Sequence, residues 1–271
     1  MEHELIIRLG VFATAFAAFA TWERKAPRRI RTRPIAERWI ANLGIVAIDT
    51  VVLRILFPLA AVGMALVAEE RQWGLLNNID LPVWLAIVLG VVALDFVIYL
   101  QHVLFHAVPT LWRLHMVHHA DLDYDLTTGI RFHPVEILLS MLIKYAAVVS
   151  LGPPAVAVLI FEVVLNASAM FNHGNIRLPE KWDRRIRRLI VTPDMHRVHH
   201  SVIKRETNSN YGFNLSIWDR LFGTYREAPE AGHENMTIGL TQFRDPTRLT
   251  LGGILLLPFR GNVGRYPINR D

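Results

Sequence analysis

The chain has 271 residues, of which 52% are hydrophobic and 20% charged, and its formal net charge is +5. The apolar and aromatic content is too high for a disordered segment, and the absence of cysteine excludes disulfide scaffolds, thiolate zinc sites, cysteine nucleophiles and cysteine-held iron–sulfur clusters. The positive charge stands beside long apolar runs, which is typical of a membrane protein and not of a nucleic-acid-binding protein.

The first apolar run, residues 5–20, has the length of a signal peptide but not its pattern. Glu2 and Glu4 stand where a signal peptide carries positive charge, and the segment 21–25 offers no small-residue cleavage site. We therefore expect this run to form an uncleaved helix.

Four further apolar runs follow along the chain. They cover residues 39–68, 82–100, 135–151 and 153–171, and the last two meet at Gly152-Pro153-Pro154. About 20 apolar residues span a bilayer as a helix, so three or four of the five runs are long enough, while the last two alternatively form a re-entrant hairpin. The pattern predicts an all-α, multi-pass transmembrane bundle of about four or five membrane helices. A soluble all-α protein with buried helices is the alternative.

Basic residues concentrate between the first two runs, in residues 24–38, and again in residues 177–188. The segment 69–80, in contrast, contains one basic residue, Arg71. Because lysine and arginine favour the cytoplasmic side of a membrane, we expect the N-terminus outside and the segments 24–38, 102–131 and everything after 173 in the cytoplasm. Arginine far outnumbers lysine, which is typical of a GC-rich bacterial genome and favours the bacterial inner membrane.

Twelve histidines occur in the chain, and most of them follow a regular spacing. They form an HxxxH pair (His102, His106), two HxxHH triplets (His115, His118, His119 and His196, His199, His200) and a lone His173 in Phe-Asn-His-Gly-Asn. An α-helix turns about 100° per residue, so each pair or triplet points to one side of its helix. Imidazole binds first-row transition metals, and the set therefore predicts a metal site. Its chemistry alone leaves zinc, copper, nickel and iron open.

Other polar residues are candidates for a supporting role around the metal. Asp95 and Tyr99 share a helical stripe with the HxxxH pair, and a carboxylate commonly accepts the second N–H of a metal-bound histidine. Thr192-Pro193-Asp194 is a helix-start signal that places Asp194 beside the second triplet. His133 precedes a proline, so we expect extended backbone there and an outer or surface role.

The remaining features point to ordinary structural roles. We expect His3 and His233 to be solvated, since each stands alone in a polar segment. Tryptophans are common in membrane-interface belts, and we expect Trp112, Trp182 and Trp218 to lie there. The apolar run 249–258 is too short to span and is expected to pack over the bundle as an interfacial piece.

The ordered set of histidines resembles the fatty acid hydroxylase/sterol desaturase superfamily of integral-membrane, non-haem di-iron enzymes. The resemblance covers residues 88–227. Its supporting segments are Asp95-x3-Tyr99-x2-His102, Trp112-Arg-Leu-His115, Arg131-Phe-His-Pro134 with Glu136, Thr192-Pro-Asp-Met-His196, Asn210-Tyr-Gly212 and Trp218-Asp-Arg-Leu-Phe-Gly-Thr224.

The resemblance implies a ligand set for two iron ions on the cytoplasmic side. Those ligands would be His102, His106, His115, His118, His119, His173, His196, His199 and His200, with Asp95, Tyr99, His133, Asp194 and Asn175 around them. Some relatives carry another histidine where this chain has Ala169, so water, Asn172 or Asn175 would complete one iron site. The implied division is membrane helices in 1–87, a catalytic domain in 88–227 and a tail in 228–271.

The implied reaction is the hydroxylation or desaturation of a C–H bond in a membrane lipid. Oxygen would be the co-substrate, and electrons would come from a separate reductase, ferredoxin or cytochrome, for which the basic face 184–188 is a candidate docking site. The lipid itself stays open among fatty acyl, sterol, sphingoid, ether-lipid and aminolipid classes. Two alternatives remain: a histidine-rich membrane metal transporter and a bis-histidine haem electron-transfer protein.

Overall fold

The computed structural model describes residues 3–260 and 262–268, and within these ranges the chain is helical apart from isolated β-bridges. The long helices are α1 (Glu4–Lys25), α2 (Ile35–Leu56), α4 (Val83–Ala107), α6 (Pro134–Leu151) and α7 (Ala155–Asn172). Five helical stretches in the described residues are long and apolar enough to cross a membrane. The predicted all-α, multi-pass bundle is confirmed.

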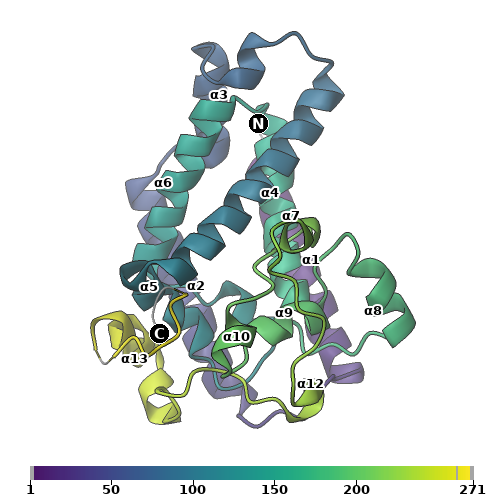
Figure 1. The fold of residues 1–271 in the computed structure, drawn as a ribbon. Helices are drawn as coiled ribbons and strands as arrows, with labels where there is room; N and C mark the ends of the chain where they lie inside the picture. The colour runs from purple at the N-terminus through teal and green to yellow at the C-terminus, as the bar shows by residue number, and fades with distance from the viewer. Residues whose placement is uncertain (1–2, 261, 269–271) are drawn as a thin grey trace.

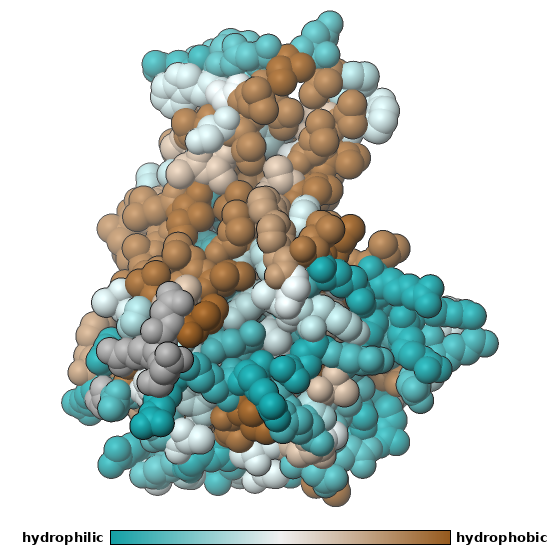
Figure 2. All heavy atoms as spheres, in the orientation of Figure 1, coloured by the Kyte–Doolittle hydropathy of each residue, from teal (hydrophilic) through white to brown (hydrophobic). Residues whose placement is uncertain are grey.

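Shorter helices complete the chain. They are α3 (Ala60–Glu70), η1 (Leu75–Asn78), α5 (Pro109–His119), η2 (Thr128–Ile130), α8 (Glu180–Ile186), α9 (Pro193–His199), α10 (Lys204–Thr207), α11 (Ile217–Leu221), α12 (Gly232–Asn235), η3 (Pro246–Leu249), α13 (Leu251–Leu256) and η4 (Leu257–Phe259). In Figure 1 the long helices rise from a lower layer, here called the cap, that contains α8 to α13. Figure 2 shows apolar side chains covering the long helices and hydrophilic side chains covering most of the cap.

Two breaks in the long helices follow from proline and glycine. The run 39–68 was expected to be one helix, but the structure divides it into α2 and α3 on either side of residues 57–59. Pro58 explains this correction, because proline disfavours helical backbone at the residue before it and removes a backbone donor. The break at Gly152 was expected, and its left-handed backbone (φ 63°) ends α6 before Pro153.

The basic segment 24–38 lies against the cap. The backbone N–H of Arg28 donates to the carbonyl of Asn175 at 3.0 Å, and the N–H of Thr32 donates to Asp123 at 2.6 Å. The buried Glu23 carboxylate accepts from the backbone N–H groups of Leu126 and Asn175, both at 3.2 Å. The three segments that were expected to share one side of the membrane therefore lie at one end of the bundle.

The side of the membrane remains a prediction, and reporter fusions test it. Fusions at Arg33 and Arg187 should both report a cytoplasmic location, because the basic segments lie at the same end of the bundle. A fusion at Asn77, in η1 between α3 and α4, should report the opposite side. An outside signal at Arg187 would contradict the proposed orientation of the cap.

The C-terminal segment packs into the cap. Ile254 of α13 and Leu257 of η4 belong to a buried cluster with Trp112 and Met116 of α5. The prediction that Trp112 lies in a membrane-interface belt is wrong, because its ring is fully buried and its Nε1–H donates to the carbonyl of Val263 at 3.1 Å. Trp182, in contrast, is exposed on α8, where its ring lies under Arg185.

Candidate metal centre

The structure gathers the nine histidines into two adjacent groups. One group contains His102, His106, His115, His119 and His199, and the other contains His118, His173, His196 and His200. Within each group, one ring nitrogen from every member lies within 4.8 Å of the others, and all nine side chains are buried. The spacing motifs do not map one to one onto the groups, since each HxxHH triplet contributes to both.

Four elements supply these side chains, and each follows its local sequence signal. The pair His102 and His106 ends α4, and the first triplet ends the short helix α5, which begins with Pro109. His173 caps the C-terminus of α7. In α9, Thr192 is the predicted N-cap and accepts from the N–H of Met195 at 3.4 Å. The short helices therefore present rings at fixed angles to the ends of α4 and α7.

The Nε2 atoms of the histidines face one another at close range. In the first group, the Nε2 atoms of His102 and His115 are 3.1 Å apart, and those of His106 and His119 are 3.2 Å apart. In the second group, the Nε2 of His173 lies 3.1 to 3.2 Å from the Nε2 atoms of His118, His196 and His200. Each group is thus organised around a small volume bounded by ring nitrogens.

Backbone carbonyls determine which ring nitrogen carries the proton in three of the histidines. The Nδ1–H groups of His102, His199 and His173 donate to the carbonyl oxygens of Tyr211, Ser209 and Ala169, each at 2.7 Å. The lone pair of Nε2 is then free in each ring, which is the usual arrangement of a metal-bound histidine. Sequence reasoning did not find these partners, because a carbonyl group has no residue-type signature.

Side-chain acceptors orient two further rings. The Nδ1–H of His115 donates to the Glu136 carboxylate at 2.6 Å, and that of His106 donates to the amide oxygen of Asn208 at 3.0 Å. Glu136 stands in the first turn of α6, after the His133-Pro134 helix start. It belongs to one of the motifs that carry the family resemblance, but it was not among the predicted site residues.

The donor set fits two cations. Burial lowers the pKa of His115 and of His173 to about 3, so both imidazoles are neutral at physiological pH. Because the Nδ1–H groups of His102 and His115 both point outward, no proton lies between their Nε2 lone pairs, which face each other at 3.1 Å. The Nε2 of His199 is buried without a hydrogen-bond partner. Neutral imidazole is the ligand form of histidine, and a metal ion would satisfy these lone pairs.

Asp95 and Tyr99 lie away from the rings that they were expected to support. The Asp95 carboxylate accepts from the amide of Asn214 and from the indole N–H of Trp218, both at 2.8 Å. The Tyr99 hydroxyl lies 2.9 Å from that of Thr224. Asp95 precedes the HxxxH pair by two helical turns, which amounts to about 10 Å along the axis. It therefore contacts α11 and the loop before it, and not a histidine.

Three other candidates also have partners different from those expected. Asp194 pairs with Arg28 and Arg197. The side chain of Asn175 bonds to the backbone of Arg29 through both its oxygen and its nitrogen, so both of its polar atoms have partners outside the histidine groups. His133 has the expected extended backbone, but its Nε2–H donates to the carbonyl of Leu255 at 3.1 Å. None of them contacts the histidine groups through these bonds.

His233 differs from its prediction as well. It was expected to be solvated, but only 11% of its side chain is exposed, and its Nε2 lies 3.7 Å from Asp194. Burial lowers its pKa to about 4. His233 is covered because α12 packs against α9, a contact between segments far apart in the sequence that residue spacing does not reveal.

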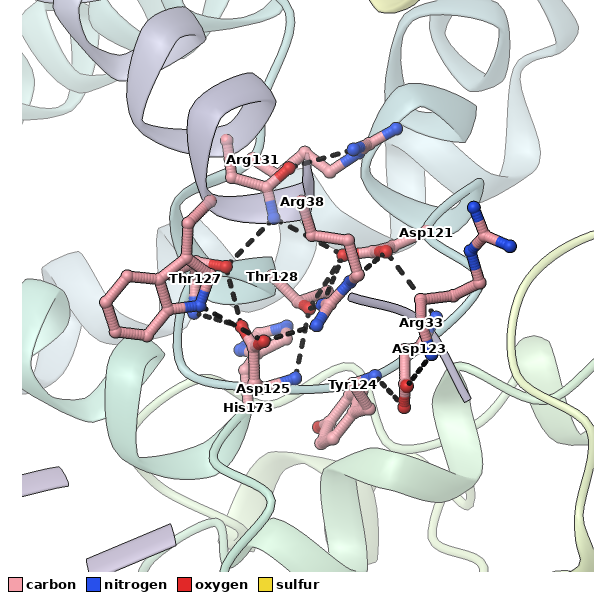
Figure 3. Close-up of polar contacts among 12 residues, drawn as sticks. Arg33, Arg38, Asp121, Asp123, Tyr124, Asp125, Thr127, Thr128, Arg131 and His173 are labelled. Atoms are coloured by element: carbon pink, nitrogen blue, oxygen red, sulfur yellow. Dashed lines mark hydrogen bonds and ion pairs between the residues drawn. The ribbon is translucent and has the colours of Figure 1, made fainter. Parts of the chain in front are cut away.

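A network of buried charges supports the loop after the first HxxHH triplet (Figure 3). The guanidinium of Arg38, from α2, donates to Asp121 at 2.7 and 2.8 Å and also pairs with Asp125. Arg131 extends the network by donating to Asn42 at 2.8 Å and to the carbonyl of Val117, within α5, at 2.8 Å. The network thereby fixes the loop and α5 to α2.

A cavity of about 680 Å³ adjoins the first histidine group. His102, His115 and Glu136 line it at the cap end, together with the apolar side chains of Phe132 and Phe213. Its volume is within the range of small-molecule binding pockets. A bound molecule would therefore lie directly against the rings of the first group.

Replacing Glu136 by glutamine tests the contact that orients His115. The variant should retain its fold, because the two side chains have the same shape. It should nevertheless lose about 10- to 100-fold in metal affinity or activity, the usual effect of changing such a partner, because the amide oxygen of glutamine accepts from the Nδ1–H of His115 without the negative charge of a carboxylate. Metal titration of the purified protein measures the effect. Asp95→Asn is the matched control, and an equal loss in that variant would contradict the assignment of Glu136.

The family model for fatty acid hydroxylase matches residues 87–224. An ornithine lipid hydroxylase of Rhizobium tropici is 34% identical over 161 residues, which cover 59% of this chain and 47% of that protein. An alkylglycerol monooxygenase of Xenopus tropicalis is 30% identical over 210 residues, which cover 74% of this chain and 43% of that protein.

A human alkylglycerol monooxygenase is 31% identical over 163 residues, covering 58% of this chain and 33% of that protein. The chain thus spans less than half the length of each of these curated relatives. No solved structure matches it.

Proposed function

The chain belongs to the fatty acid hydroxylase family, and from that membership we propose that it is a membrane-bound oxygenase that hydroxylates or desaturates a C–H bond of a lipid. Oxygen is the co-substrate, and electrons come from a separate donor protein. The observation that carries the proposal is the position of the cavity. It brings a molecule from among the long, apolar helices into contact with His102 and His115.

The nine histidines are the proposed ligands of two iron ions, divided as the structure divides them into groups of five and four. When bound there, the irons supply the activation of oxygen that cleavage of a strong C–H bond requires. The chain's own residues orient and protect the site. Glu136 and the carbonyls of Tyr211, Ser209 and Ala169 hold four rings with Nε2 inward. Burial of the rings limits their contact with bulk water.

The positions of the histidines support this proposal over the two alternatives. A transporter places its ion site near the middle of the membrane on broken helices, whereas here the rings lie at the ends of α4 and α7 and in the cap. A bis-histidine haem protein needs one pair of facing rings. Two compact groups with Nε2 atoms 3.1 to 3.2 Å apart leave no space for a macrocycle between them.

The relatives favour polar membrane lipids as substrates. One relative is named for an aminolipid and the others for an ether lipid. We propose a substrate of this kind, a catalytic domain in residues 88–227, and a bacterial inner membrane with the cap in the cytoplasm.

The candidate docking site for the electron donor is the face of α8 that carries the exposed Arg184 and Arg185. Arg187 does not belong to that face, since it is buried and pairs with Asp183.

Lipid analysis of a deletion strain tests the proposed function. The strain should lack a lipid that the parent contains and should accumulate its precursor, lighter by one oxygen atom for a hydroxylase or heavier by two hydrogens for a desaturase. Restoring the wild-type chain should restore the product, while restoring His199→Ala should not. Identical lipid profiles in the deletion strain and its parent, under aerobic growth with the chain expressed, would count against a lipid oxygenase.

A further inference from the structure

A cluster of charged residues lines the cavity at a distance from the histidines. It consists of Glu4 and Arg8 of α1, Arg54 of α2, Lys144 of α6 and Glu162 of α7. Five elements of the bundle, α1, α2, α4, α6 and α7, together with neighbouring loops, thus enclose one cavity that is charged in one part and bounded by His102 and His115 in another. The proposed function does not use these charges.

The acidic members of the cluster are already paired. Glu162 receives one hydrogen bond from Arg8 at 2.6 Å and one from Lys144 at 2.5 Å, so both of its oxygens are engaged. Glu4 accepts from the Nε–H of Arg8 at 2.9 Å. Arg54, in contrast, makes no ion pair with any residue that the structure describes, and the cluster carries three cations against two anions.

The cluster reaches from a helix end into the bundle. Arg54 is exposed in the last turn of α2. Lys144 and Glu162 lie deeper, near the middle of α6 and α7, each about two turns from the hairpin end of its helix. Charges at this depth in a membrane protein are costly and generally face a functional cavity. From Glu136, which contacts the metal-site histidine His115, to Lys144 the chain advances by eight helical residues, which is about 12 Å along α6.

Most of the unused hydrogen-bonding capacity of the cluster consists of donors. Lysine and arginine have no acceptor, and both oxygens of Glu162 and one oxygen of Glu4 are engaged by Arg8 and Lys144, so a ligand near Arg54 would meet its N–H groups and the remaining ones of Lys144. Such donors bind an anionic group of a ligand, for which a carboxylate and a phosphate are equally suitable. The rest of the ligand would extend past Ile98 and Met141 toward the rings, along an apolar wall.

We propose that Arg54 and Lys144, with Arg8 held beside them, form a subsite for the anionic polar group of the lipid. The inference rests on the proposed function and specifies its substrate class: a lipid with an anionic group and an extended hydrocarbon chain.

A binding measurement tests the subsite without turnover. The metal-loaded protein in lipid nanodiscs is titrated, without oxygen or reductant, with palmitate, hexadecyl phosphate and hexadecanol, which share one chain and differ in the polar group. Charged hydrogen bonds of this kind contribute about 1.5–3 kcal/mol. At least one of the two anions should therefore bind about 10- to 100-fold more tightly than the alcohol, and the better anion identifies the group.

The same titration of Arg54→Gln should show that difference reduced by about tenfold or more, with hexadecanol binding and metal content unchanged. Arg71→Gln is the matched control, because Arg71 lies outside the cavity lining on the loop after α3. Equal affinity for all three probes, or unchanged anion binding by Arg54→Gln, would overturn the subsite. Since the measurement involves no turnover, a chain that binds as expected but leaves lipids unoxidised would contradict only the proposed function.

Discussion

Replacing His199 by alanine is expected to abolish activity and to reduce the metal content of the purified protein. His199 contributes to the group of five through an Nε2 atom that has no hydrogen-bond partner, while the carbonyl of Ser209 accepts from its Nδ1–H at 2.7 Å. The substitution removes a nitrogen whose position is determined by α9. Loss of a residue that only orients a ligand lowers metal affinity or activity by about 10- to 100-fold. Loss of the ligand itself should lower them by more than that.

His233→Ala is the matched control for this prediction. His233 is also a histidine of the cap with little exposure, but it faces Asp194 and belongs to neither histidine group. Its loss should leave the metal content unchanged and the activity close to that of the wild type. Metal analysis and turnover of both variants test the ligand assignment together. If His199→Ala kept its metal and its turnover, or if His233→Ala lost both, the assignment would be wrong.

Replacing Arg38 by methionine is expected to produce the largest loss of stability. The guanidinium is buried between Asp121 and Asp125, so methionine leaves two buried carboxylates without their cation. Breaking a buried pair by removing one partner costs about 3–5 kcal/mol. The loop from Asp121 to Arg131 would lose its attachment to α2, and α5 with its three histidines would be held less rigidly.

Thermal unfolding in detergent, with metal analysis alongside, measures this effect. The matched control is Arg33→Met, five residues earlier, where the arginine pairs with the exposed Glu37. Ion pairs of that kind contribute about 0–1 kcal/mol, so Arg33→Met should unfold close to the wild type. If the two variants unfolded at the same temperature, the buried network would not be what holds the loop in place.

Local sequence signals predicted the elements that carry the site. The HxxxH spacing places two rings on one side of the end of α4, the HxxHH triplets belong to the short helices α5 and α9, and Thr192-Pro193 marks the start of α9, as the structure confirms. The all-α, multi-pass architecture followed from apolar runs of sufficient length. These features depend on residues close together in the sequence, which periodicity and capping rules describe.

Contacts between distant segments were the part that could not be predicted. Asp95 was the expected carboxylate because it shares a stripe with His102, yet Glu136 from another helix contacts His115. Likewise, the partners of His102 and His199 are carbonyls of the loop 208–211, whose side chains carry no signal of that role. Trp112 was expected in a membrane-interface belt and is buried, and His233 was expected to be solvated and is mostly covered, in both cases by segments that fold onto them from elsewhere.

Quantitative metal analysis of the purified wild-type protein tests the central claim most directly. The two histidine groups, with five and four inward-facing ring nitrogens, are proposed to bind one iron ion each. Protein produced in iron-replete cells and measured by mass spectrometry against its amino-acid content should therefore contain close to two irons per chain. A single ion per chain, or zinc at both sites in a catalytically active preparation, would contradict the assignment.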